Sequence, residues 1–320
     1  MLRAGLDIGG TKCAAVLGET EGTAIRVIGR RCFSTADFPQ PDKCLEKLCS
    51  LLSELLEEHA TPEHQPGGVG ISCGGPLDSI RGIIQSPPNL PGWDNIPATE
   101  IVTHLTGLPA KLENDANACA LAEWKFGAGR GTENMLFLTF GTGMGAGIIV
   151  NGALYSGSSG MAGECGHIRL AENGPCGYGK NGSFEGFCSG GGIARLGKFR
   201  AEQALKAGKP FVWGQNTADI KAVTAKSLAA AADAGDPDAR AIYAESGRRL
   251  GQGLAILMDI LNPERIVIGS IFARSGHLLR PEMEKVLQRE VLPSSLRVCS
   301  VVPSELGDAI GDIASLAITD

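Results

Sequence analysis

The chain has 320 residues, of which 43% are hydrophobic and 20% charged, and its net charge is −6. This length allows two domains that each bury a core. The acidic balance and the lack of a basic patch argue against a nucleic-acid partner, and no apolar run reaches the roughly 18 residues of a transmembrane helix. Because a strand is expected from residue 2, no room remains for a signal peptide, and we expect a cytoplasmic protein without a membrane partner.

Ten cysteines are scattered along the chain, mostly inside apolar stretches, and none forms a C-x-x-C pair. This distribution favours buried, reduced thiols over a disulfide framework. The 45 glycines indicate many tight turns, of the kind found where backbone approaches a ligand.

The first predicted elements are strands over 2–8, 12–18 and 23–34, with Asp7-Ile-Gly9-Gly10-Thr11-Lys12 between the first two. The two glycines let backbone N–H groups approach an anion, and Thr11 adds a hydroxyl donor. Asp7 could orient a divalent cation, usually through water for Mg²⁺. The alternative is a plain hairpin with an acidic neighbour. The spacing matches neither a P-loop nor G-x-G-x-x-G, so a nucleotide site here would be a hairpin clamp for phosphate.

The other elements follow from hydrophobic periodicity, proline and glycine signals. We expect helices over 41–58, 95–106, 114–127, 190–206, 224–234, 238–261, 281–290 and 307–318, and strands over 69–73, 110–112, 133–140, 146–150, 265–269 and 297–302.

A second strand–glycine turn–strand unit contains Gly141-Thr142-Gly143-Met-Gly145. By itself it could be a structural hairpin. Together with Asp7–Lys12 it forms a weak internal repeat, which suggests two related halves that face one ligand. Two opposed glycine hairpins are a way to build a nucleotide cleft.

Asp115 stands between Asn114 and Asn117 at a predicted helix start. One interpretation is a first-turn carboxylate that stabilises the helix. The other is a general base that accepts a proton from a substrate hydroxyl during phosphoryl transfer.

Glu164, His167 and Glu185 form a polar cluster among glycines. Two carboxylates and an imidazole suit the adjacent hydroxyls of a sugar, although a solvated loop would also explain them. Cys176 raises the question of zinc, but one Cys and one His are an incomplete ligand set.

With these motifs together, the sequence resembles the ROK family (repressor, open reading frame, kinase), and its bacterial sugar kinases in particular. The matching segments are 7–12, 74–76, 88–93, 113–117, 141–145, 163–167, 179–185, 266–269 and 307–308. The resemblance implies an α/β, two-domain actin-like ATPase fold (a duplicated ribonuclease H-like unit) with a cleft for nucleotide and sugar. The domains would be 1–115 plus 304–320 and 116–303, and a homodimer would be expected.

The resemblance implies ATP- and Mg²⁺-dependent phosphorylation of a hexose at its 6-hydroxyl. Asp115 matches the catalytic base, and the matching sugar-binding residues are Gly75, Asn89, Asn114, Asp115, Glu164, His167 and Glu185. The phosphate and Mg²⁺ region corresponds to Asp7, Gly9, Gly10, Thr11, Lys12, Gly141, Thr142, Gly143 and Gly145, with Asp7 reaching the metal through water or phosphate. Gly269 matches an adenosine contact, whereas Ser270 replaces the usual second glycine.

The family's zinc motif usually reads C-x-C-G-x-x-G-C-x-E, and two of its three cysteines are Tyr178 and Ser183 here. Both are poor zinc ligands, so we predict no structural zinc. A non-catalytic sugar sensor is the alternative function. The family's repressors carry a helix-turn-helix before the first glycine turn, which we do not expect ahead of Asp7. Glucose, N-acetylhexosamines, fructose, mannose and allose stay open as substrates.

Overall fold

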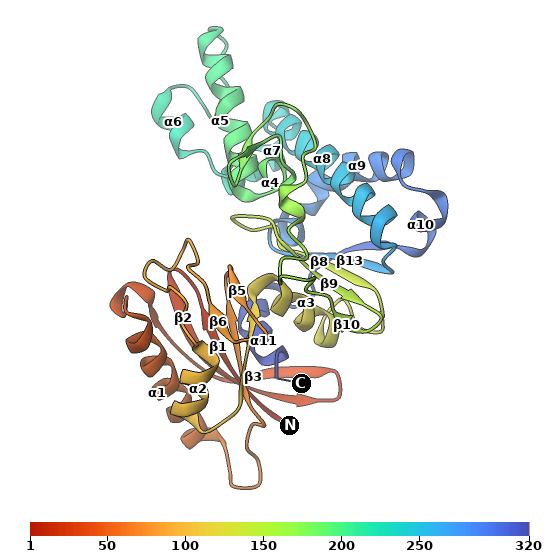
Figure 1. Ribbon diagram of the computed structural model, residues 1–320. Coiled ribbons are helices and arrows are strands. Elements are labelled where there is room, and N and C mark those ends of the chain that lie inside the picture. The colour runs from red at the N-terminus through yellow and green to blue at the C-terminus, as the bar shows by residue number, and fades with distance from the viewer. Residues whose placement is uncertain (320) are drawn as a thin grey trace. The chain divides into compact units, whose positions relative to one another are not determined.

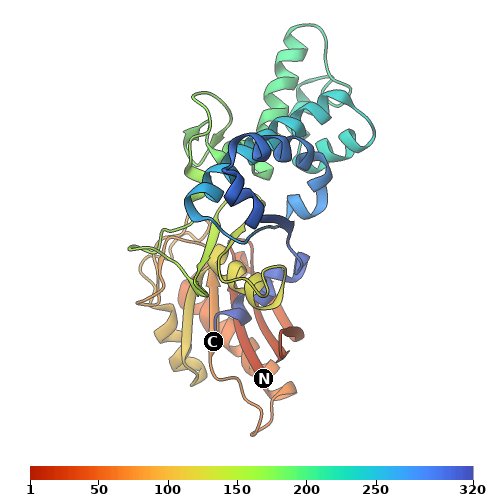
Figure 2. The ribbon, with the colours of Figure 1, turned by 90° about the vertical axis from the view of Figure 1, so that its right-hand side faces the viewer.

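Two five-stranded sheets with flanking helices make up the α/β fold, which a computed structural model describes over residues 1–319 (Figure 1). The chain divides into two compact units. Unit 1 comprises Met1–Phe137, Gly147–Ala162 and the chain from Glu305 onward, and unit 2 comprises Leu138–Ala146 and Gly163–Ser304. Both ends of the chain therefore belong to unit 1 (Figure 2). The domain limits predicted above, at 115/116 and 303/304, stay a prediction.

The first sheet has the strand order β3-β2-β1-β4-β7. Its strands are β1 (Leu2–Ile8), β2 (Lys12–Glu21), β3 (Ala24–Ser34), β4 (Val69–Cys73) and β7 (Ala110–Asn114). β1 to β3 pair antiparallel through hairpins, whereas β4 and β7 run parallel to β1. The carboxyl ends of β1, β4 and β7 therefore lie along one edge of the sheet.

Each face of this sheet is covered by a helix pair, α1 (Pro41–His59) with α2 (Ala98–Thr106) and α3 (Asp115–Phe126) with α11 (Ile310–Ala317) (Figure 1). β2 shows the reason, because its side chains alternate between faces. Cys13, Ala15 and Leu17 join the core under α1, and Ala14 and Val16 pack with Leu316 of α11.

Glycines in three neighbouring strands let α11 lie directly on the sheet backbone. A Cβ at Gly5 would be 2.2 Å from Ser315 Oγ, one at Gly70 would be 2.0 Å from the Ser315 carbonyl oxygen, and one at Gly18 would be 2.5 Å from Leu316. No side chain fits in this layer, so the glycines fix the depth at which the last helix docks.

The second sheet has the order β10-β9-β8-β13-β14. Its strands are β8 (Met135–Leu138), β9 (Ala146–Val150), β10 (Ala153–Leu154), β13 (Arg265–Ile268) and β14 (Ser300–Pro303). The main helices of unit 2 are α5 (Gly190–Lys206), α7 (Ala225–Asp233), α8 (Pro237–Leu261) and α9 (Ile271–Glu290). α8 and α9 approach closely at Gly247 and Gly251, where a Cβ would lie 2.3 Å and 2.7 Å from carbonyl oxygens of α9.

Several short elements complete the chain. They are β5 (Leu77–Asp78), β6 (Ile83–Ile84), β11 (Cys176–Gly177), β12 (Lys180–Asn181), α4 (Phe184–Phe187), α6 (Thr217–Ala222), α10 (Pro293–Val298) and the 3-10 turns Thr35–Asp37, Cys165–His167 and Gly307–Ala309. None of the helices over residues 1–319 is both long and apolar enough to span a bilayer.

Two of the predicted elements near the C-terminus are wrong in extent. The helix expected over 281–290 begins earlier, at Ile271. Pro281, the first residue of the expected helix, lies inside a longer helix that bends at Ser275. The strand expected over 297–302 begins only at Ser300, since Pro293 opens α10 first.

Replacing Gly70 by alanine tests the docking of α11. The added methyl group meets a backbone oxygen that no rotamer change can move, so we expect Gly70→Ala to lower the free energy of unfolding by about 1–3 kcal/mol, as overpacking does. Urea denaturation measures this change. Gly67→Ala is the matched control, because no atom lies within 4 Å of a Cβ there. Equal effects of the two variants would contradict the packing argument.

Candidate functional site

The β1–β2 turn is tight. Gly9 N–H donates to the Lys12 carbonyl oxygen at 3.1 Å, and a Cβ at Gly9 would lie 2.8 Å from that oxygen. Gly10, Thr11 and Lys12 are exposed. The predicted residues of this turn therefore remain available to a ligand.

Thr35 holds this turn from behind. Its Oγ1 donates to the Gly9 carbonyl oxygen at 2.7 Å, and its N–H donates to the Thr11 carbonyl oxygen at 3.0 Å. The side chain is 7% exposed. Sequence reasoning missed this residue because nothing in local periodicity links it to the turn 24 positions earlier.

Asp7 ends β1 in a crowded acidic environment. Burial first, then the charges of Asp312 and Asp115, raise the pKa of Asp7 to about 7, while Arg30 lowers it. Arg30 Nε in turn donates to both carboxylate oxygens of Asp312 at 2.9 Å. The sequence analysis missed Arg30 and Asp312. The structure brings them to Asp7 because α11 docks beside β1.

Asp115 opens α3 directly after β7. Asn114 is the N-cap, and its Oδ1 accepts from Ala116 N–H at 2.9 Å. Asp115 Oδ1 accepts from the same N–H at 2.8 Å, and the side chain is exposed. The residue thus stabilises the helix start, as one interpretation predicted, and presents a carboxylate to solvent at the strand-end edge.

The other residues predicted for unit 1 surround these two. A Cβ at Gly75 would lie 3.3 Å from Asn114 Nδ2, and one at Gly74 would lie 4.0 Å from Asp115 Oδ2. A Cβ at Gly10 would lie 2.7 Å from the Cβ of Asn89, whose side chain is exposed. All predicted residues of unit 1 therefore gather at the carboxyl ends of β1, β4 and β7.

The second glycine turn, Phe140–Gly145, is held in unit 2 by two helix starts. Gly190 N–H of α5 donates to the Gly141 carbonyl oxygen at 2.7 Å, and Ile271 N–H of α9 donates to the Phe140 carbonyl oxygen at 3.0 Å. Helix N-termini carry partial positive charge, which favours an anion nearby.

Glu185 connects the predicted sugar cluster with this turn. Its Oε2 accepts from Met144 N–H at 3.1 Å and lies 3.0 Å from a Cβ placed on Gly143. A Cβ on Gly166 would lie 3.3 Å from the Glu185 Cβ, so the turn Cys165–His167 packs against the same residue. Glu164, at the start of that turn, is exposed.

The segment that differs from the family's zinc motif has its own contacts. Ser183 Oγ accepts from Gly186 N–H at 3.0 Å as the N-cap of α4, and the Tyr178 ring lies edge-on to His167 at 5.1 Å between centroids. Lys180 Nζ also donates to the His167 carbonyl oxygen at 2.7 Å. Within residues 1–319, no three or more His, Cys, Asp or Glu side chains are placed to hold a metal.

Gly269 and Ser270 also lie at the second glycine turn. Gly269 N–H donates to the Leu138 carbonyl oxygen at 3.0 Å, and Ser270 Oγ lies 3.7 Å from a Cβ placed on Gly141. Ser270 has φ 49° and ψ −107°, a conformation that glycine adopts without cost and serine does not. At the position where the family resemblance expects a glycine, the serine thus has a backbone conformation that favours glycine.

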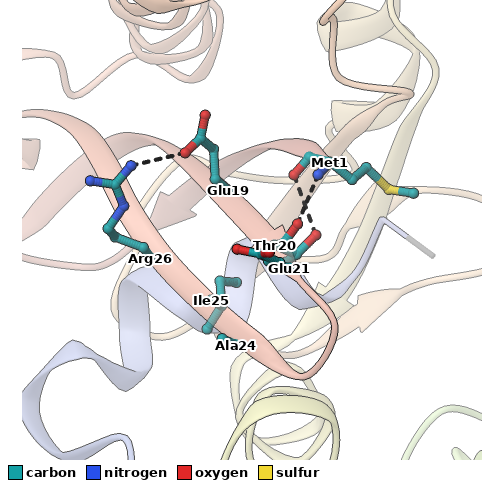
Figure 3. A pocket seen from close by; sticks show the side chains of 7 residues that line it. All are labelled: Met1, Glu19, Thr20, Glu21, Ala24, Ile25 and Arg26. Atoms are coloured by element: carbon teal, nitrogen blue, oxygen red, sulfur yellow. Dashed lines mark hydrogen bonds and ion pairs between the residues drawn. The ribbon is translucent and has the colours of Figure 1, made fainter.

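A surface hollow at the tip of the β2–β3 hairpin is distinct from these residues (Figure 3). It adjoins the start of β1, at the opposite end of the strand from Asp7. Glu19 and Arg26 form an ion pair at 2.9 Å, and the Met1 amino group donates to the Thr20 carbonyl oxygen at 2.8 Å. With these groups already paired, we assign the hollow no ligand.

Comparison with known proteins identifies the family. The model of the ROK family matches residues 3–319. The chain belongs to the ROK family. It is 34% identical over 313 residues to a glucokinase of Streptomyces coelicolor, covering 97% of this chain and 95% of that protein. The structure of a ROK glucokinase from Streptomyces griseus, in complex with glucose and AMPPNP, superimposes with a TM-score of 0.76 at 31% identity and covers 100% and 99% of the two chains.

Other ROK proteins are regulators. The chain is 30% identical over 268 residues to a xylose repressor of Caldicellulosiruptor bescii, covering 82% of this chain and 66% of the repressor. The resemblance and the α/β fold class predicted from the sequence are both confirmed. Family membership alone does not separate kinase from regulator, so that choice depends on the site.

Ser270→Gly tests the backbone strain beside the second glycine turn. Relief of the strained conformation contributes about 1–3 kcal/mol, and the extra freedom of glycine in the unfolded chain offsets about 0.5–1 kcal/mol of it. We expect a net gain of about 1 kcal/mol in the free energy of unfolding, measured in urea. Ser294→Gly in α10 is the control and should lose stability. A loss in both variants would refute the strain at Ser270.

The predicted absence of structural zinc is tested by elemental analysis of the purified protein without an affinity tag. We expect less than about 0.1 zinc per chain, because tight structural sites use four Cys or His ligands. Ser183→Cys with Tyr178→Cys restores the family's motif and is expected to raise the zinc content towards one. Stoichiometric zinc in the unmodified protein would show that the prediction is wrong.

Proposed function

We propose that the protein is an ATP-dependent hexose kinase that transfers the γ-phosphate of ATP to the 6-hydroxyl of glucose or an N-acetylhexosamine. The ROK relatives that match nearly the whole chain support the broader class, an ATP-dependent sugar kinase. The observation that carries the proposal is the exposed Asp115 carboxylate, fixed in the first turn of α3.

Asp115 acts as the general base of the proposed reaction. Its carboxylate accepts the proton of the sugar hydroxyl as that oxygen forms a bond to the γ-phosphorus, and the bond from phosphorus to the bridging oxygen of ADP breaks. A side chain on a helix start is suited to this task because the backbone around it is rigid. The neighbouring Asn114 amide supplies a hydrogen bond to the sugar.

The two glycine turns are assigned to the phosphates of ATP. In unit 1 the exposed backbone of Gly9, Gly10 and Thr11, with Lys12, is available to an anion. In unit 2 the turn Gly141–Gly145 stands at the starts of α5 and α9, where the helix ends favour negative charge. We assign the adenosine to Gly269, next to that turn.

Asp7 fits a role in holding Mg²⁺. Mg²⁺ in kinases is usually held by one or two carboxylates together with substrate phosphates and water. Burial and then the charges of Asp312 and Asp115 raise the pKa of Asp7, and a cation bound there would relieve the repulsion between these carboxylates. Bound there with ATP, Mg²⁺ would offset charge on the phosphates. Asp7 would keep it oriented, directly or through water.

We assign the hexose to the polar residues that the sequence predicts for it. Asn114 and Asp115 belong to unit 1, with Gly75 and Asn89 beside them, whereas Glu164, His167 and Glu185 belong to unit 2. Carboxylates and an imidazole accept and donate hydrogen bonds to adjacent sugar hydroxyls. The edge-on contact with Tyr178 restrains the His167 ring. The homodimer stays a prediction.

Asp115→Asn tests the general base. The amide keeps the size and the helix-capping oxygen but cannot accept the proton, so we expect kcat to fall by about three orders of magnitude, with ATP and sugar binding within a few-fold of normal. Steady-state kinetics and calorimetry measure the two effects. Asp42→Asn is the matched control, since Asp42 is also a first-turn carboxylate, in α1. Near-normal turnover of Asp115→Asn would show that the base is misassigned.

An ADP-release assay with ATP, Mg²⁺ and single hexoses identifies the acceptor. Glucose, mannose, fructose, allose, N-acetylglucosamine and N-acetylmannosamine form the panel, and we expect one of them to turn over far above the rest. If folded protein turns over none but binds one of them, the chain is a non-catalytic sugar sensor and the kinase proposal is wrong.

A further inference from the structure

One buried carboxylate underlies the β7–α3 junction. Glu113 precedes Asn114 in β7 and is 9% exposed. Its Oε1 accepts three hydrogen bonds, from Asn114 N–H at 2.8 Å, from Asn117 Nδ2 at 2.9 Å and from Ser79 Oγ at 3.1 Å. A single charged oxygen therefore holds a strand end, a helix turn and a loop together.

Asn117, one of the three donors, shows how strongly the hydrogen bond to Glu113 is favoured. Its side chain is 2% exposed, and its Oδ1 has no hydrogen-bond partner in the described part of the chain. A buried polar atom without a partner is unfavourable. Asn117 nevertheless points its Nδ2 at Glu113, so the bond to the carboxylate decides the orientation of the amide.

The three bonds surround the position of Asp115. Asn114 lies one residue before it, and Asn117 lies two residues after it in the same helical turn. Asp115 itself is exposed, and its backbone lies between these two anchors. Through Ser79, the carboxylate of Glu113 also holds the loop after β5. This loop lies a few residues after Gly75 in the chain.

We propose that Glu113 is a positioning residue for Asp115: by binding both flanks of the helix start, its carboxylate fixes where the base meets the sugar hydroxyl. This inference rests on the proposed kinase function. Glu113 is buried and is not assigned a contact with substrate. Displacing a reacting group by about 1 Å can cost roughly 100-fold in rate, so loss of this anchor should act on the chemical step.

The test compares Glu113→Ala and Glu113→Gln in the full-length protein, with the hexose that the wild type phosphorylates. In Glu113→Ala we expect kcat to fall by about 100-fold, with the KM values for ATP and sugar within about threefold of the wild type. Glu113→Gln keeps an oxygen at the same place and should retain kcat within about tenfold, since neutral acceptors form weaker bonds.

Leu52→Ala, in the core of the same unit, controls for loss of stability. It should lower the melting temperature without changing kcat at temperatures well below melting. If Glu113→Ala does not fold, Ser79→Ala and Asn117→Ala carry the test, because each removes one bond to the carboxylate and should lower kcat at unchanged KM.

The outcomes separate this inference from the proposed function. A wild type that is inactive with every hexose refutes the kinase. An active wild type whose Glu113→Ala variant keeps its kcat, or changes only as Leu52→Ala does, refutes the positioning role and leaves the kinase intact.

Discussion

The seating of α11 on the bare backbone of three strands is the constraint on which unit 1 depends. Gly5, Gly18 and Gly70 leave no space between helix and sheet, so the helix can approach at one depth only. That depth brings Gly311 to 3.9 Å from the Asp7 carboxylate, measured to a Cβ placed on the glycine, and brings Asp312 within electrostatic reach of it. The surroundings of the strand-end carboxylate are therefore built by residues 300 positions away.

Negative charges gather at the edge of the first sheet where β1, β4 and β7 end, and their repulsion costs stability. Burial first, and then the charges of Asp312 and Asp115, raise the pKa of Asp7, and Arg30 offsets only part of this negative charge by its contact with Asp312. Perturbed pKa values of this kind cluster at functional sites. The glycine turns of the two units provide the opposite environment, with backbone N–H groups and helix starts that favour anions.

The sequence was sufficient for features that local chemistry determines. The glycine turn after Asp7, the first two strands and the helix start near Asp115 follow from residue type and spacing, and the structure has them within a few residues. Thr35, Arg30 and Asp312 could not be predicted, because each acts across a long sequence separation on a partner that periodicity does not identify. Glu113 was visible only as a member of a motif, since its three donors meet only after the chain folds.

The same distinction explains the loop that differs from the family's motif. Tyr178 and Ser183, in place of two cysteines, indicated that the segment had lost zinc ligands, but not which contacts hold it instead. Ser183 caps α4, and Tyr178 lies against His167, so the segment is held by a helix cap and a ring contact. Ser270 is the converse, since its side chain departs from the family's glycine while its backbone keeps the glycine conformation.

The position of α11 also bears on the order in which the protein folds during its synthesis. The ribosome makes β1 to β7 within the first 114 residues, but α11, one of the two helices that cover their second face, comes from residues 310–317. Until then Ala14, Val16 and the glycine backbone of that face lack the layer that buries them. Domains generally fold as units as they emerge, but unit 1 cannot complete its core before unit 2 has been translated. The nascent chain thus exposes an unfinished sheet for most of its synthesis, which is the period in which chaperones would act on it.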